Sequence, residues 1–178
     1  LRKAISPIVK HLLASVVIFG ADGNLSSKKI LPTLFNLWRR KLVPRDMLIF
    51  GYARAAIDSE AFRKHIFKCI YQPSQTQSDR KEFLRRCHYV SGQFDSIDGI
   101  SRLGALIAEE EALREHSRQR HNAWALSRDP DGTEVAEQVR LYYMAVPPKL
   151  YSGICAALRA AMPAAAAASA AVAAPAAA

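Results

Sequence analysis

The sequence has few cysteines and no long run of large apolar residues. Cys69, Cys87 and Cys155 lie at wide spacings without a CxxC pair, so the sequence predicts neither a metal site nor a disulfide framework. We expect three free thiols in a reducing compartment. The apolar runs are much shorter than the roughly 20 residues that span a bilayer, so no membrane segment is expected.

Acidic residues are scarce relative to basic ones. The chain has 25 Lys and Arg against 16 Asp and Glu, a net charge of +9. This excess favours anionic partners, such as phosphorylated metabolites, nucleotides or nucleic acid, without choosing among them. Half of the 178 residues are hydrophobic and 23% are charged, which is typical of a globular domain and not of a disordered chain.

The two ends of the chain carry little information about function. Residues 164–178 are alanine-rich and of low complexity, and we assign no function to the tail 163–178. The chain starts at Leu1 and not at methionine, so we expect that an upstream piece is missing or was removed. Residues 1–14 are expected to be an N-terminal extension and 15–162 the folded domain.

Two short apolar stretches predict strands that are buried on both faces. They are residues 15–19, which are followed by Gly20, and residues 47–52, which are apolar without interruption until Gly51. Between them, apolar residues from Leu25 recur at helical spacing until Pro44 breaks the pattern. A strand, a helix and a second strand in this order predict a parallel βαβ unit.

Strands and helices are expected to alternate along the rest of the chain. The predicted helices are 58–71, a basic segment ending at Arg86, 97–115 and 150–161, and the predicted strands are 88–90 and 140–146. Residues 72–79 are expected to be a polar loop and 116–134, which lack periodicity, an exposed insertion. The pattern predicts an α/β fold with a Rossmann-like, doubly wound parallel sheet of about four strands. The fourth strand is expected to keep an open edge.

The turn after the first strand has the composition of a phosphate-binding turn. Gly20 and Gly23 leave two positions without side chains, and the helix that follows directs its N-terminal N–H groups toward an anion. The spacing is GxxG and not the full GxGxxG, so a purely structural turn stays open as an alternative. Asp22 places a negative charge in the same turn.

An arginine follows the second strand. Arg54 lies where the adenosine ribose of a dinucleotide binds in a doubly wound fold, and a guanidinium there suits the 2′-phosphate of NADP. A solvated surface arginine is the alternative.

Four blocks together resemble a known family. VVIFGADGNLSSKKILPTLFNLW, GYAR, YVSGQFD and RLYYMAVPPKLY are similar, in this order, to the coenzyme-domain motifs of glucose-6-phosphate dehydrogenase. The family pattern GASGDL appears here as GADGNL, so Asp22 and Asn24 replace a hydroxyl residue and an aspartate.

The resemblance implies a set of site residues. The expected dinucleotide-binding residues are Gly20, Ala21, Asp22, Gly23, Asn24, Leu25, Ser26, Ser27, Arg54 and Tyr151, with Arg54 at the 2′-phosphate of NADP. Lys29 would face the substrate and nicotinamide end, and Pro147 and Pro148 would shape the floor between coenzyme and sugar. Because Asp22 is acidic, we hypothesise that NADP binds more weakly than in typical relatives and that NAD is excluded less.

The resemblance also implies an activity, whose catalytic residues are missing here. The family oxidises glucose 6-phosphate to 6-phosphogluconolactone in the pentose phosphate pathway, as homo-oligomers in the cytoplasm or in plastids. Its RIDHYLGK and EKPFG motifs do not occur in this chain, so we expect no catalytic residue and no activity from the chain alone. The histidines, interpreted as surface or packing residues, are His11, His65, His88, His116 and His121.

The sequence leaves two other functions open. A non-catalytic NADP-binding or regulatory paralogue is favoured by the altered turn and the missing motifs. Nucleic-acid binding rests on the net charge and on the cluster of Arg80, Lys81, Arg85 and Arg86 beside Phe83. This cluster matches no recognition motif and is better interpreted as a solvated helix face, so no nucleic-acid partner is expected.

Overall fold

The computed structural model describes residues 12–70, 77–126 and 137–162. Its strands are β1 (Leu12–Phe19), β2 (Leu48–Ala53), β3 (Cys87–Ser91) and β4 (Glu137–Met144). Its helical segments are η1 (Ser26–Ile30, π-helical), α2 (Leu31–Arg39), α3 (Ser59–Cys69), α4 (Gln77–Leu84), α5 (Ile97–Leu126), η2 (Pro148–Leu150, 3₁₀) and α6 (Tyr151–Ala161).

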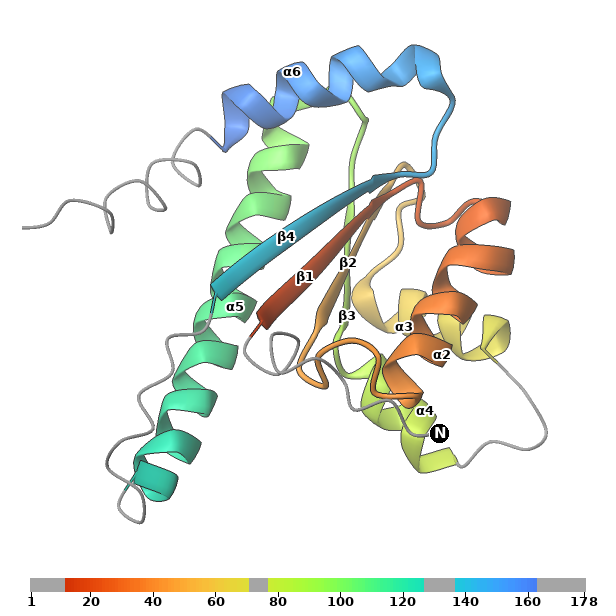
Figure 1. Cartoon of the computed structure of the whole chain (residues 1–178). Helices are drawn as coiled ribbons and strands as arrows, with labels where there is room; N and C mark the ends of the chain where they lie inside the picture. Colours follow the sequence, from red (N-terminus) through yellow and green to blue (C-terminus); the bar gives the residue numbers. More distant parts are fainter. Residues whose placement is uncertain (1–11, 71–76, 127–136, 163–178) are drawn as a thin grey trace, which may run out of the picture.

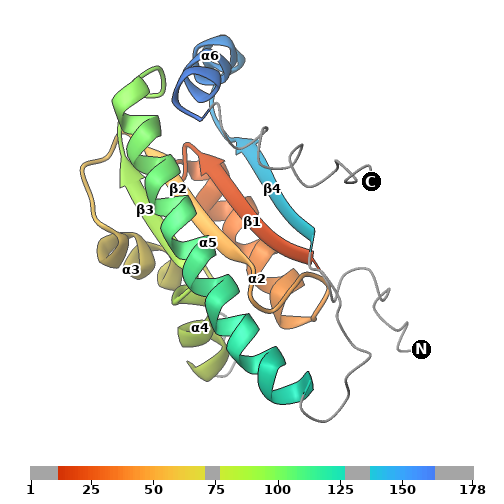
Figure 2. The same cartoon turned by 90° about the vertical axis from the view of Figure 1, so that its left-hand side faces the viewer.

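The four strands form one parallel sheet in the order β3-β2-β1-β4. Helices α2, α3 and α4 cover one face, α5 covers the other, and α6 packs on α5 near the C-terminal ends of the strands (Figures 1 and 2). The predicted α/β class and the parallel sheet are confirmed.

Apolar spacing explains how α2 packs on the sheet. Leu31, Phe35 and Trp38 follow one another at helical spacing and are all buried. The Phe35 and Trp38 rings meet Phe83 of α4 edge-on, with ring centroids 5.2 and 5.6 Å apart. This aromatic cluster joins α2 to α4, and α4 lies toward the end of the sheet opposite the strand C-termini (Figure 1).

Several predicted boundaries are wrong. Strand β1 begins at Leu12 and not at residue 15, because Leu12, Leu13 and Ala14 pair with the start of β4. For the same reason β4 begins at Glu137 and ends at Met144, three residues before the predicted start and two before the predicted end. The N-terminal extension therefore contains three strand residues. Its residues 1–11 lie outside the described part, as does the tail 163–178.

Helices α4 and α5 are also longer than predicted. Helix α4 begins at Gln77, inside the expected polar loop. Helix α5 continues to Leu126, so residues 116–126 of the expected insertion are helical, and 127–134 lie outside the described residues. The last turns of α5 extend beyond the sheet, where no core requires an apolar stripe, so periodicity could not reveal them (Figure 2).

The interpretation of the basic cluster as a solvated helix face is wrong at Arg80 and at Arg86, which is half-buried with its guanidinium 5.7 Å from the centre of the Trp38 ring. Arg80 is 8% exposed, and its guanidinium lies 4.8 Å from the centre of the Phe67 ring. Lys81 and Arg85 are exposed as expected.

Cys69, Cys87 and Cys155 are free thiols. None of the described helices is long and apolar enough to cross a membrane.

Candidate functional site

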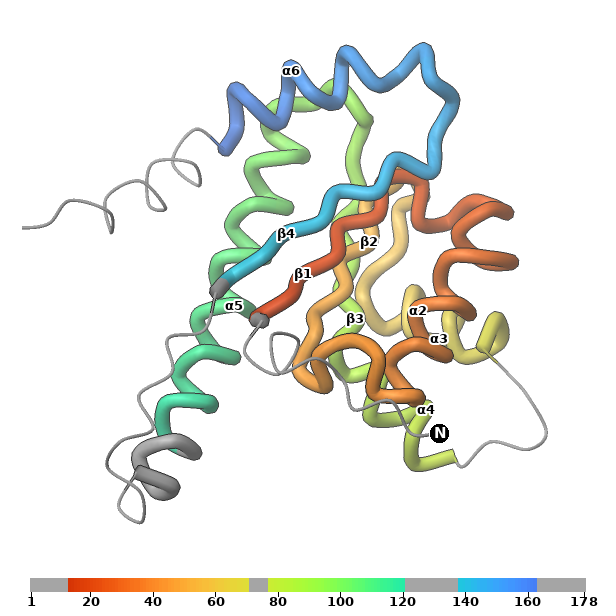
Figure 3. The backbone as a smooth tube through the Cα atoms, viewed as in Figure 1, coloured from red at the N-terminus to blue at the C-terminus, as the bar shows by residue number. Residues whose placement is uncertain are grey.

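The C-terminal ends of the strands meet at one edge of the sheet, and backbone hydrogen bonds join the loops that follow them (Figure 3). Gly20 N donates to Tyr52 O at 2.8 Å, which connects the turn after β1 to β2. Gly92 N donates to Ala53 O at 2.9 Å, which connects β2 to the loop after β3. Open α/β sheets bind ligands at this edge.

The turn after β1 requires glycine at its first position. Gly20 has φ +79°, and a Cβ there would lie 2.5 Å from Ala145 O, in the segment after β4. Gly23 N donates to Gly20 O at 3.0 Å and closes the turn. A Cβ at Gly23 would meet only Gly20 O, at 3.1 Å. The space outside Gly23 is therefore open to a ligand, as a phosphate-binding turn requires.

A helix starts directly after this turn. Ser27 N and Ser27 Oγ both donate to Gly23 O, at 3.0 and 2.9 Å. The buried Ser26 hydroxyl donates to Gly20 O at 2.8 Å. The first N–H groups of a helix have no intrahelical acceptor and attract anions. The turn thus combines open space with the positive end of a helix dipole.

The predicted turn residues divide by exposure. Ala21 and Ser26 are fully buried, so they shape the turn from inside and have no exposed atoms for a ligand. Asp22, Asn24 and Leu25 are exposed at the mouth of the turn, and Lys29 is exposed on η1.

Arg54 borders a cavity of about 350 Å³ at the same edge of the sheet. The Arg54 side chain is exposed, and its guanidinium lies 5.9 Å from the centre of the Phe94 ring. The residues that line the cavity are Arg54, Gln93, Phe94, Asp95, Lys149, Leu150, Ser152 and Gly153. Two cations and one carboxylate leave it with a positive balance.

Seven of these eight lining residues were not predicted as site residues; only Arg54 was. The blocks YVSGQFD and VPPKLY contain five of the seven, so the resemblance to the family could have identified these five residues.

Asp22 acts on a buried tyrosine next to the Arg54 loop. The Tyr89 hydroxyl donates to Ala55 O at 2.9 Å. Burial of the ring, and secondly the nearby Asp22 carboxylate, raises the pKa of Tyr89 to about 12. Asp22 therefore lies close enough to Tyr89 to affect its ionisation.

The sequence prediction missed His65, which contacts the turn from α3. His65 Nε2 lies 2.8 Å from Ser27 Oγ and 3.6 Å from Cys69 Sγ. Because the Ser27 hydroxyl donates to Gly23 O, it accepts a hydrogen bond from the His65 Nε2–H. The interpretation of His65 as an ordinary packing residue is incomplete, since Ser27 and His65 are 38 residues apart and no local pattern relates them.

The structure brings the remaining predicted residues to the same edge. Pro147 and Pro148 are exposed directly after β4, and the Tyr151 hydroxyl donates to Met144 O at 3.3 Å. Within residues 12–70, 77–126 and 137–162, no group of three or more His, Cys, Asp or Glu could hold a metal ion.

Known proteins resemble the chain over most of its length. The profile described as "Glucose-6-phosphate dehydrogenase, NAD binding domain" matches residues 17–133. The chain belongs to the glucose-6-phosphate dehydrogenase family. It is 33% identical over 146 residues to the cytoplasmic isoform of glucose-6-phosphate 1-dehydrogenase from Solanum tuberosum. The aligned region covers 82% of this chain and 25% of that protein. It is 32% identical to a chloroplastic enzyme of Arabidopsis thaliana, over 82% of this chain and 23% of that protein.

Solved structures agree with this family. A glucose-6-phosphate dehydrogenase in complex with its substrate glucose-6-phosphate superposes with a TM-score of 0.68 at 29% identity, covering 86% of this chain and 28% of that one. The enzyme from Mycobacterium avium, with a TM-score of 0.61 at 21% identity, shares the fold. The chain thus corresponds to the N-terminal coenzyme-binding domain and spans about a quarter of the length of these relatives.

Proposed function

We propose that this chain is the NADP-binding part of an enzyme that oxidises glucose 6-phosphate to 6-phosphogluconolactone in the pentose phosphate pathway. The observation that carries the proposal is the presence of the glycine turn and Arg54 at one edge of the sheet, on loops joined through the hydrogen bond between Gly20 N and Tyr52 O. The family membership and the substrate-bound structural relative support it.

Each part of the site has a role in this proposal. The N–H groups that follow Gly23 bind the pyrophosphate, and the exposed Arg54 guanidinium binds the 2′-phosphate with two parallel hydrogen bonds. Tyr151 lies beside the coenzyme, and Lys29 faces its nicotinamide end. Bound NADP would accept the hydride from the sugar. Pro147 and Pro148 separate the coenzyme from the sugar.

The whole protein is proposed to be a homo-oligomer of the cytoplasm or of plastids. The names of its relatives include both cytoplasmic and chloroplastic enzymes.

The test is a calorimetric titration of NADP and of NAD into the full chain and into Arg54→Ala. We expect Arg54→Ala to weaken NADP binding at least tenfold, because it removes a charge-assisted contact, and to change NAD binding about twofold or less. Arg40→Ala, an exposed arginine beyond α2, is the matched control and should change neither affinity. Equal losses for both coenzymes would contradict the assignment of Arg54 to the 2′-phosphate.

Asp22 provides a second test of the same site. The exposed Asp22 carboxylate in this turn would repel a nearby 2′-phosphate and would accept hydrogen bonds from a free ribose diol. We therefore propose that Asp22→Ser raises the ratio of NADP affinity to NAD affinity severalfold. An unchanged ratio would mean that Asp22 does not face the ligand.

A further inference from the structure

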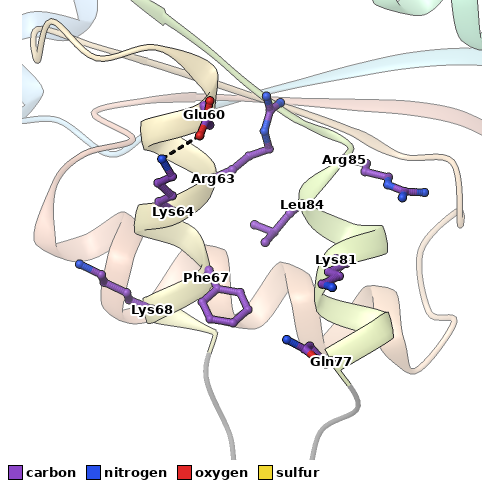
Figure 4. A pocket seen from close by; sticks show the side chains of 9 residues that line it. All are labelled: Glu60, Arg63, Lys64, Phe67, Lys68, Gln77, Lys81, Leu84 and Arg85. Carbon is purple, nitrogen blue, oxygen red and sulfur yellow. Dashed lines mark ion pairs between the residues drawn. The ribbon is translucent and has the colours of Figure 1, made fainter.

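A basic groove lies between α3 and α4, apart from the proposed coenzyme site. Its volume is about 850 Å³, and none of its lining residues belongs to the glycine turn or to the Arg54 cavity. Phe67 of α3 and Leu84 of α4 point into the space between the two helices and form its apolar floor (Figure 4).

The charged side chains form two rows along the groove. Lys64 and Lys68 are four residues apart on α3, and Lys81 and Arg85 are four residues apart on α4. Residues at this spacing lie on one face of a helix, one turn apart. The two rows flank the floor from opposite sides (Figure 4). Basic side chains thus line both margins of an apolar strip.

Part of this charge is not compensated within the described chain. Lys64 Nζ pairs with Glu60 at 2.7 Å, and Arg63 donates to Cys87 O at 3.0 Å. Lys68, Lys81 and Arg85 have no ion-pair partner among the residues that the structure describes. With five basic residues and one acidic residue in its lining, the groove has a positive potential.

We propose that this groove binds an acidic amphipathic helix of a protein partner. Apolar side chains of such a helix would contact Phe67 and Leu84. Carboxylates four residues apart along its margins would match Lys81 and Arg85 on one wall and Lys68 on the other. The match is one of charge, of spacing and of the apolar strip between the two rows.

A nucleic acid fits this groove less well. Single-stranded nucleic acids bind by stacking bases on free aromatic faces. Phe67 is the one aromatic residue of the lining, and the Arg80 guanidinium lies 4.8 Å from its ring centre, over one face. A small inorganic anion would leave the apolar floor without a partner.

The probe is a fluorescein-labelled helical peptide of about 16 residues, with leucines on one face and glutamates along both margins. Binding to the full chain is measured by fluorescence anisotropy. We expect a peptide with glutamine in place of glutamate to bind at least tenfold more weakly, and added salt to weaken binding of the acidic peptide. Equal binding of the two peptides would overturn the proposal.

Charge reversal locates the site. We expect Lys81→Glu/Arg85→Glu to weaken binding of the acidic peptide about tenfold or more, and a peptide with lysine at the same margins to regain affinity for this variant. Arg120→Glu/Arg159→Glu, at exposed positions of α5 and α6, makes the same change in net charge and is the control. Circular dichroism melting checks that both variants fold.

Two results would contradict this location. One is an equal loss of peptide binding in both double variants. The other is a single-stranded RNA oligonucleotide that binds the chain more tightly than the peptide and depends on Lys81 and Arg85 in the same way.

Discussion

Strands β2 and β4 are both parallel neighbours of β1, yet their surroundings differ. All six residues of β2 are buried, whereas Val139, Leu141 and Tyr143 of β4 are 42%, 55% and 42% exposed. Helices α2, α3 and α4 cover β2 and β3 but do not extend over β4 (Figures 1 and 2). The β1–β3 part of the sheet therefore contains its own core. Strand β4 presents an apolar face and an outer edge that pairs with no strand among the described residues, and these are properties of an interface.

The largest expected effect comes from filling space within β2. A Cβ at Gly51 would lie 2.6 Å from the end of the Phe62 ring and 2.9 Å from the Ala21 Cβ. We expect Gly51→Val to lower the free energy of unfolding by about 3 kcal/mol, because α3 and the glycine turn must both move. Urea denaturation measures the change. Leu141→Val on β4 is the comparison, and its effect should stay within about 0.5 kcal/mol. Similar losses in the free energy of unfolding for the two variants would mean that β2 and β4 do not differ in how tightly they are packed.

A second test uses a titratable group in the buried, β1–β3 part of the sheet. His88 of β3 is 9% exposed, and its ring lies 5.3 Å from the Phe50 ring. Burial, and secondly the Arg63 charge, lowers the pKa of His88 to about 4. The imidazole is therefore neutral at pH 7, and its Nδ1 lies 3.2 Å from Glu110 Oε1.

The sign of the pH effect follows from this pKa. The unfolded state binds a proton near pH 6.5, while the folded state does so only near pH 4. Stability should therefore fall as the pH is lowered from about 6.5 to 4, by about 3 kcal/mol, because each unit of pKa shift corresponds to about 1.4 kcal/mol. His88→Phe should flatten the slope in urea denaturation series, and His116→Gln, an exposed histidine on α5, should leave it unchanged. A slope that persists in His88→Phe would assign the effect to other groups.

The sequence predicted the buried strands better than the partly exposed strand β4. The apolar runs of β1 and β2 predicted two buried parallel strands, because burial on both faces leaves an uninterrupted run. The bounds of β4 were wrong by up to three residues. Its first residues, Glu137 and Gln138, are polar, and its strand character depends on pairing with Leu12 and Leu13 of β1, which local pattern does not encode.

The candidate site shows a similar limit. Gly20 and Arg54 could be proposed from the sequence, because each directly follows a strand and its residue type has a clear chemical role. His65 could not, because its role depends on how α3 packs beside η1. Phe94 and Lys149 reach the cavity from two further loops, and only the four-block resemblance placed those loops near the coenzyme.

The third prediction concerns the contact between α3 and the glycine turn. We expect His65→Ala to weaken NADP binding about threefold to tenfold, because it removes the donor that orients Ser27, while stability falls by about 1 kcal/mol. Calorimetric titration and urea denaturation measure the two effects. His116→Ala is the control. In a double-mutant cycle, His65→Ala should cause no further loss of NADP affinity once Ser27→Ala is present. Additive losses would mean that His65 does not act through Ser27.

The smallest effect on stability is expected at β4, where association should change instead. Leu141 and Tyr143 are exposed on the face that no described helix covers, so a lysine at either position can reach water without leaving a cavity. We expect Leu141→Lys/Tyr143→Lys to change the free energy of unfolding by about 0.5 kcal/mol or less. Sedimentation velocity should show weaker self-association of the variant, because the lysines place charge on an apolar face beside an edge that no described strand pairs with. Gln138→Lys adds charge to an exposed position of the same strand and is the control. If this control reduces self-association equally, net charge and not the apolar face of β4 governs association.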